Sequence, residues 1–255
     1  MGMFRRHFFS CLLLLASTTL LAQEPTPPAA FPSHWGYTGL ATIPTATFEA
    51  DGTIGLGASY LPVAYATLPP QEQPERLFYI AHNFLPGFEV SGSIARPLHS
   101  DGWGLGTRAI NLKLRVLKEG KHLPAVAVGV LDGFGAARFT QAFWVVASKS
   151  LHLSNQLRLL VHGGYGAPHA YRPSVAGGTP RLERQDLLHL VGPFAGAELQ
   201  FYGRLSVACE AHSRGIQGAL RLRMLRHVVW SVGTNATGAM ALGVGASWQL
   251  PVAKN

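Results

Sequence analysis

Alternating apolar and polar residues, in about a dozen short glycine-rich segments, constrain this chain more than any other feature. Between residues 109 and 116 the even-numbered residues are Ile, Leu, Leu and Val, and the odd-numbered residues are Ala, Asn, Lys and Arg. Successive side chains of a strand point to opposite faces of its sheet, so each segment has one apolar and one polar face. A soluble sandwich would bury the apolar face against a second sheet. A transmembrane barrel would expose it to lipid and turn the charges into its lumen.

The connections between these segments favour the barrel. Over most of the chain they alternate between long and short, as expected when one end of a barrel carries extracellular loops and the other carries periplasmic turns. A sandwich gives no reason for this alternation. The sequence therefore predicts an all-β fold, a single antiparallel transmembrane β-barrel of about 12 strands with periplasmic termini. The strands are expected near residues 53–61, 76–83, 88–96, 108–117, 125–131, 142–149, 156–165, 194–201, 205–212, 216–224, 228–234 and 239–248.

The N-terminus is typical of an exported protein. Arg5 and Arg6 precede an apolar stretch from Phe8 to Leu21, which is too short to span a bilayer and is followed by a predicted cleavage site after Ala22. We therefore expect a bacterial outer-membrane location after export. The predicted divisions are a signal peptide (residues 1–22), a periplasmic leader (23–52), the outer-membrane barrel (53–250) and a C-terminal tail (251–255). Within the leader, the segment from Trp35 to Ala46 is open to three interpretations: a linker, a periplasmic lid or a plug folded into the lumen.

Composition narrows the chemistry. Removal of the signal peptide leaves Cys209 as the only cysteine, so the exported chain has no internal disulfide. The formal net charge of +8 suggests anionic partners, among which are the phosphates of lipopolysaccharide. One cysteine and scattered histidines do not provide the ligand spacing of a metal site. We expect no metal, no cofactor and no nucleic-acid partner.

Several motifs, in order along most of the chain, resemble those of the YjbH-like outer-membrane proteins. The opening signature is Gly36-Tyr37-Thr38-Gly39-Leu40, followed by Ile43-Pro44-Thr45-Ala46 and Asp51-Gly52. Later matches are Glu89-Val90-Ser91-Gly92, Leu117-Lys118-Glu119-Gly120-Lys121, Val145-Val146-Ala147-Ser148-Lys149 and Phe194-Ala195-Gly196-Ala197-Glu198. Two segments differ from the family pattern, namely Gly106-Thr107 before Arg108 and the residues from Asp132 to Ala137. The resemblance implies a non-enzymatic outer-membrane β-barrel associated with exopolysaccharide production, secretion or surface assembly.

The charged side chains on the polar faces of the predicted strands form the candidate site. A charged side chain that faces lipid would cost roughly 2–4 kcal/mol near the bilayer midplane, so these side chains are expected to face the lumen. They could form cross-strand ion pairs that hold a narrow barrel together, or a basic lining that guides an anionic polysaccharide through a narrow pore. Outer-membrane lipid and periplasmic or outer-membrane export proteins are the other expected partners. The candidate lumen residues are Lys113, Arg115, Arg158, Glu198, Glu210, Arg221 and Arg223.

A second function remains open. Some outer-membrane barrels are acyl hydrolases with a serine, a histidine and a carboxylate at the membrane rim. Glu210, His212 and Ser213 lie together near the outer end of a predicted strand and could supply these groups. No Gly-x-Ser-x-Gly motif is present, and this fold does not require one. We therefore expect that the protein is not an enzyme, and we keep the rim acyl hydrolase as the alternative.

Overall fold

A computed structural model describes residues 29–67, 73–98, 106–133, 141–168 and 190–250. The predicted signal peptide and the predicted C-terminal tail lie outside the described residues. Apart from one 3-10 turn, η1 (Val63–Tyr65), the named elements are all strands. Their bounds are β1 (Thr53–Leu61), β2 (Glu75–Leu85), β3 (Phe88–Pro97), β4 (Thr107–Leu117), β5 (Ala125–Leu131), β6 (Ala142–His152), β7 (Leu157–Pro168), β8 (Gly192–Phe201), β9 (Leu205–His212), β10 (Gly215–Met224), β11 (Val228–Asn235) and β12 (Met240–Gln249).

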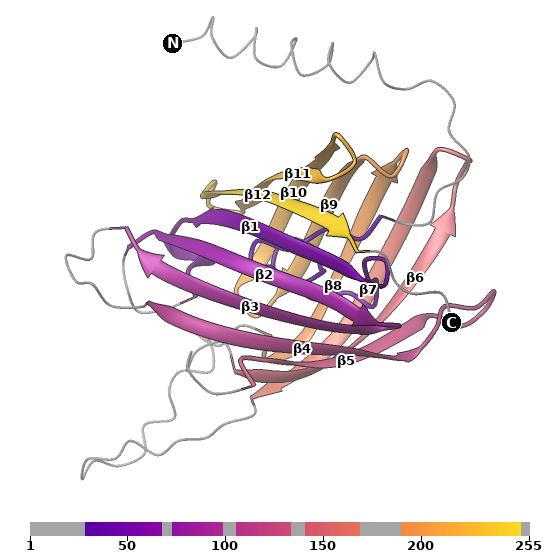
Figure 1. Ribbon diagram of the computed structural model, residues 1–255, viewed down its shortest axis with the longest axis horizontal. Helices are drawn as coiled ribbons and strands as arrows, with labels where there is room; N and C mark the ends of the chain where they lie inside the picture. The colour runs from indigo at the N-terminus through magenta and orange to yellow at the C-terminus, as the bar shows by residue number, and fades with distance from the viewer. Residues whose placement is uncertain (1–28, 68–72, 99–105, 134–140, 169–189, 251–255) are drawn as a thin grey trace, which may run out of the picture.

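The strands form one closed antiparallel barrel (Figure 1). Each strand pairs with its neighbours in sequence, and β12 pairs with β1, with Thr53 opposite Gln249 and Tyr60 opposite Leu242. This confirms the predicted fold class. β1, β5 and β9 have the predicted bounds, and the others differ from the prediction by a few residues.

The two faces of the barrel wall have the predicted character. On β4, Ile110 and Leu114 are 40% and 50% exposed, whereas Asn111 and Lys113 between them are buried. The other strands repeat this pattern, with outward side chains such as Phe143 and Trp230. The exterior is therefore apolar, and the polar groups face the lumen.

Among the described residues, no helix is both long enough and apolar enough to cross a membrane.

Glycine makes room for large side chains inside this narrow barrel. The ring of Tyr79, from β2, lies against Gly57 of β1 and Gly245 of β12. A Cβ atom at either glycine would come within 2.3 Å of the outer end of that ring. Gly36, which precedes the barrel, also contacts Tyr79 and has a φ of +93°, so a side chain there would meet both a clash and backbone strain. These glycines allow Tyr79 to pack between the wall and the chain inside it.

The two ends of the barrel differ. At one end the turns are short, for example residues 86–87, 153–156 and 202–204, and we call it the short-turn end. The other, the long-loop end, carries the connections 62–74, 98–106 and 169–191. At the long-loop end, η1 turns inward and buries Tyr65, and Glu75 accepts hydrogen bonds from the amide and hydroxyl groups of Thr67. Residues 62–67 therefore fold over this end of the lumen.

Candidate functional site

Residues 29–52 fill the lumen, and we call this segment the plug (Figure 1). All residues from 30 to 46 are buried apart from Pro32, which is half-buried. The chain enters and leaves at the short-turn end, because Ala29 contacts Gln200 near the end of β8 and Gly52 directly precedes β1. Between these points Trp35 reaches the long-loop end, where its indole N–H donates to the carbonyl of Tyr65. Of the three interpretations of residues 35–46, the structure supports the plug.

The plug has a local fold of its own. Two isolated antiparallel bridges join Pro32 to Thr38 and Gly39 to Pro44. The amide of Leu40 donates to the carbonyl of Ile43 over 2.9 Å. These bonds satisfy part of the backbone, and the barrel wall binds much of what remains, as buried polar groups require.

Two buried carboxylates of the wall bind donors of the plug. Glu89 of β3 accepts from the Thr38 amide at 2.9 Å and from the Thr38 hydroxyl at 2.5 Å. Glu210 of β9 accepts from the amide and the hydroxyl of Thr42, at 2.9 and 2.6 Å, and from the Ile43 amide at 3.3 Å. Hydrogen bonds to ionised groups are among the strongest in proteins, so these two residues are the main acceptors for the plug.

Three cations of the wall bind carbonyl oxygens of the plug. Lys113 donates to the carbonyls of Thr38 and Thr47 and lies 3.9 Å from the Glu89 carboxylate. Arg221 donates to the carbonyl of Gly39 over 2.6 Å. Arg223 donates to the carbonyl of Ala30 over 2.5 Å. The lumen cations are therefore partly occupied by neutral oxygen atoms of the chain itself.

Two phenylalanines of the plug gather these cations into pairs. Phe31 lies 4.8 Å from the Arg221 guanidinium and 5.0 Å from that of Arg223. Phe48 lies 4.2 Å from the Lys113 ammonium and 4.4 Å from the Arg115 guanidinium. Aromatic faces attract cations, most strongly away from water. The sequence analysis missed both phenylalanines, since neither lies in an alternating segment.

The structure places all seven candidate residues on the lumen face of the wall. Glu198 pairs with Arg221 at 2.8 Å and accepts from Ser206, so it belongs to the Arg221–Arg223 group. Glu210 of β9 lies beside this group in the wall and contacts Thr42 of the plug, whereas Lys113 and Arg115 come from β4. Arg158 lies near the short-turn end of β7, opposite Gln200. The wall charges thus form separate groups around the plug. That they act together on a solute remains a prediction.

The proposed hydrolase residues also contact the plug. Glu210 and His212 both face the lumen, and their closest side-chain atoms are 3.8 Å apart. The Nε2 atom of His212 lies 3.2 Å from the Thr42 hydroxyl, and its Nδ1 atom accepts from the amide of Arg214. With both ring nitrogens in these contacts, the imidazole positions the plug and the following turn. A role as a base for Ser213 would require other partners.

Burial shifts the pKa of ionisable groups of the plug, among them His34 and Glu49. His34 is almost fully buried beside Gly233, and burial, together with the positive charge of Arg221, lowers its pKa to about 4. Burial raises the pKa of Glu49, although Arg223 lies 3.1 Å away and opposes that rise. His34 is therefore neutral in the closed lumen.

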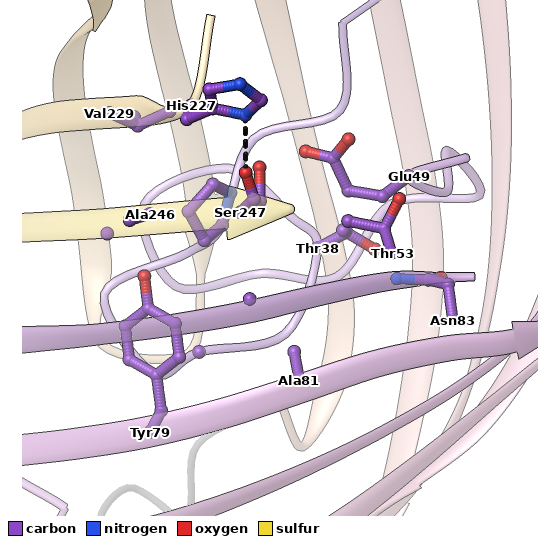
Figure 2. A pocket seen from close by; sticks show the side chains of 14 residues that line it. Thr38, Glu49, Thr53, Tyr79, Ala81, Asn83, His227, Val229, Ala246 and Ser247 are labelled. Atoms are coloured by element: carbon purple, nitrogen blue, oxygen red, sulfur yellow. Dashed lines mark hydrogen bonds between the residues drawn. The ribbon is translucent and has the colours of Figure 1, made fainter. Parts of the chain in front are cut away.

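A small cavity separates the plug from the wall at the short-turn end (Figure 2). Glu49 lines the cavity on the plug side, Tyr79 and Asn83 line it from β2, and His227 and Ser247 line its other side. The His227 imidazole hydrogen-bonds the Ser247 carbonyl. Its volume of about 30 Å³ leaves room for ordered water. Among the described residues, no group of three metal-binding side chains converges anywhere on the chain. This space suits water rather than a cofactor.

Comparisons with known proteins agree with the resemblance seen in the sequence. A family model described as "Exopolysaccharide biosynthesis protein YbjH" matches residues 32–175. Similar solved structures include the KdgM porin, with a TM-score of 0.46, 9% identity and coverage of 78% of this chain and 99% of that one. The KdgM porin in complex with disordered oligogalacturonate gives a TM-score of 0.45 at 8% identity and the same coverages. A triple mutant of the Rhodopseudomonas blastica porin gives 0.30 at 11% identity, covering 68% of this chain and 55% of that one. No curated protein matches by sequence.

Proposed function

This chain belongs to the family of the exopolysaccharide biosynthesis protein YbjH, and we propose on that premise that it is an outer-membrane conduit for an anionic polysaccharide, closed at rest by its plug. The conduit takes part in secretion or surface assembly of the polymer. It binds and guides the glycan without changing it chemically.

The exterior of the wall supports the membrane location. Large apolar side chains, such as Phe78, Ile110, Phe143 and Trp230, are 40–57% exposed on the outward face. A soluble monomer rarely exposes a continuous apolar surface of this kind. In a bilayer the same surface contacts lipid, and closure of the barrel satisfies the backbone hydrogen bonds of every strand.

The lumen cations carry the proposal for the ligand. Lys113, Arg221 and Arg223 each donate to a carbonyl oxygen of a segment that is not part of the wall. If the plug withdraws, these donors lose their carbonyl acceptors on the plug, and part of their hydrogen-bonding capacity turns to the open lumen. Carboxylates of an acidic glycan supply oxygen atoms with a full charge, and arginine binds them in a two-pronged geometry.

The path of the chain supports opening by withdrawal. Both ends of the plug lie at the short-turn end, so the segment can leave in that direction without breaking any bond between strands. Opening then requires only the loss of contacts between plug and wall. The strand ladders stay intact.

A reversible covalent lock tests the proposal. The Ala46 amide lies 2.8 Å from the Ser148 hydroxyl of β6, which places the two backbones close enough for Ala46→Cys with Ser148→Cys to form a disulfide. Both native cysteines are removed first (Cys11→Ser and Cys209→Ala), and Glu89→Ala with Glu210→Ala are added to loosen the plug. In proteoliposomes we expect the reduced protein to pass a uronic-acid oligosaccharide and the oxidised protein to block it.

The controls give the result its meaning. A neutral oligosaccharide of equal length should pass more slowly, and Arg221→Gln with Arg223→Gln should remove that difference. Equal flux in the oxidised and reduced proteins would refute a conduit closed by the plug. For the rim hydrolase the decisive variant is Ser213→Ala, which should leave transport unchanged. Lipid hydrolysis that disappears in this variant would favour the enzyme instead.

A further inference from the structure

Three arginines lie together on the outward face of the barrel, at the long-loop end. Arg76 is the second residue of β2, Arg96 the last but one of β3, and Arg108 the second of β4, and all three are exposed. The three strands are consecutive neighbours in the wall (Figure 1). They present a basic surface where the apolar exterior ends.

The strand register places these charges at close range. Arg76 is directly opposite Arg96, and Arg108 is opposite Ile94, one side-chain step from Arg96 on the same face. Cβ atoms of directly opposite residues lie about 4.5–5.5 Å apart, and like charges in that position are destabilising. Within the part of the chain that the structure describes, none of these three arginines forms an ion pair with a carboxylate. An anion between them would turn this repulsion into attraction.

The cluster is confined to one side of the barrel. At the same end, the outward positions on β9 to β12 carry Ala211, Ile216, Thr234 and Met240, which are uncharged. The basic surface is therefore a local feature and does not encircle the rim.

Apolar side chains follow each arginine towards the middle of the wall. Phe78 lies next to Arg76 on the same face of β2, Ile94 next to Arg96 on β3, and Ile110 next to Arg108 on β4. They are 52%, 41% and 40% exposed, respectively. A ligand that fits this surface has negative charge at one end and hydrocarbon at the other.

We propose that the outward face of β2, β3 and β4 at the long-loop end binds a phosphorylated, acylated lipid of the outer leaflet. Its phosphates lie between Arg76, Arg96 and Arg108, since the guanidinium fork matches phosphate oxygens. Its acyl chains lie over Phe78, Ile94 and Ile110. From the proposed function this site takes only the orientation of the barrel, with the long-loop end at the outer leaflet. It does not depend on transport of a glycan through the lumen.

Binding of lipid A to the full chain in detergent tests the site, with native mass spectrometry as the readout. The variant is Arg76→Gln, Arg96→Gln and Arg108→Gln together. Its matched control, Lys118→Gln, Lys121→Gln and Arg226→Gln, removes three charges at the short-turn end. The probes are lipid A with both phosphates, lipid A without phosphates, and inorganic pyrophosphate. Using protein locked by the 46–148 disulfide separates this result from the behaviour of the plug.

We expect the wild-type and control proteins to retain bisphosphorylated lipid A, and the arginine variant to bind it at least tenfold more weakly. The lipid without phosphates should bind the wild type at least tenfold more weakly than the intact lipid. Equal binding by the arginine variant, or an equal loss in the control, would overturn the site. Pyrophosphate competing as strongly as the lipid would also overturn it, in favour of a free-phosphate site. If the triple variant lacks the heat-modifiable band of a folded barrel, Arg96→Gln alone should weaken binding at least threefold.

Discussion

The plug is held differently in the depth of the lumen and at the mouth where it enters. In the depth, Glu210 and Arg221 have side chains that are almost fully buried, and each binds backbone groups of the plug. At the mouth, Glu49 and Arg223 pair at 3.1 Å with side chains that are 18% and 19% exposed. Removing a buried, hydrogen-bonded charge leaves its partners with no water to replace it, whereas water screens an ion pair that it reaches. The deep contacts should therefore hold the plug, and the mouth should open first.

The largest expected effect comes from Glu210. Glu210→Ala removes the acceptor of the Thr42 amide, the Thr42 hydroxyl and the Ile43 amide. At about 1.5–3 kcal/mol for each hydrogen bond to a charged group, plug docking should weaken by about 3 kcal/mol or more, which is over a hundredfold in population. The rate at which a thiol reagent labels Ala46→Cys, in the background without native cysteines, measures this population. Glu210→Gln keeps one acceptor and should change the rate less. A labelling rate unaltered in Glu210→Ala would mean that the deep contacts do not hold the plug.

Acid should have a smaller effect, through His34. The pKa of His34 is lowered to about 4 in the closed lumen, and it returns to about 6.5 when the plug is released. Docking is therefore fully stable above pH 6.5 and weakens as the pH falls from 6.5 towards 4, by roughly tenfold at pH 5.5. Burial raises the pKa of Glu49, so protonation of Glu49 favours docking and acts in the opposite direction. Measured relative to an exposed cysteine labelled at the same pH, the rate at Ala46→Cys should rise between pH 7 and 5.5, and it should stay flat when His34→Gln is added. The same rise in both proteins would assign the pH dependence to another group.

The smallest effect is expected at the mouth. Glu49→Gln removes the ion pair with Arg223. Both side chains are partly exposed, so water screens the pair and its contribution is about 1 kcal/mol or less. The labelling rate should increase only a few-fold, and 0.5 M salt should reduce the difference between the two proteins. An increase as large as that of Glu210→Ala would erase the distinction between depth and mouth.

The barrel wall could be predicted from the sequence because the face on which a strand residue lies depends only on its position relative to its neighbours in the chain. On β4 and β9, each residue's face follows from its neighbours, and the apolar residues are those that the structure exposes on the outside. The same rule puts Lys113 and Arg221 in the lumen. A strand period of two was enough to place them.

The plug was not predictable in the same way. The stretch from Trp35 to Ala46 has no period, and the groups that bind it, such as Glu210 and Arg221, lie more than 160 residues away in sequence. The Thr42 amide and the Gly39 carbonyl are backbone groups, so side-chain patterns hold no signal for these two contacts. The two phenylalanines at the ends of the plug, Phe31 and Phe48, would have been the best clue. Each is an aromatic residue beside a region of turns, in a chain whose candidate lumen residues include more arginines than carboxylates.

Closure of the ring has a consequence for how the protein is made. The seam of the barrel joins β1 to β12, and the plug is attached directly to β1. The groups that bind it come from β3 and β4 at one side and from β9 and β10 near the last strand. These two sides face each other only once the sheet curls, and contacts between distant parts of a chain are slow to form. We therefore expect the plug to dock late in folding, while the sheet curls towards closure, so that the lumen is sealed as the wall is completed.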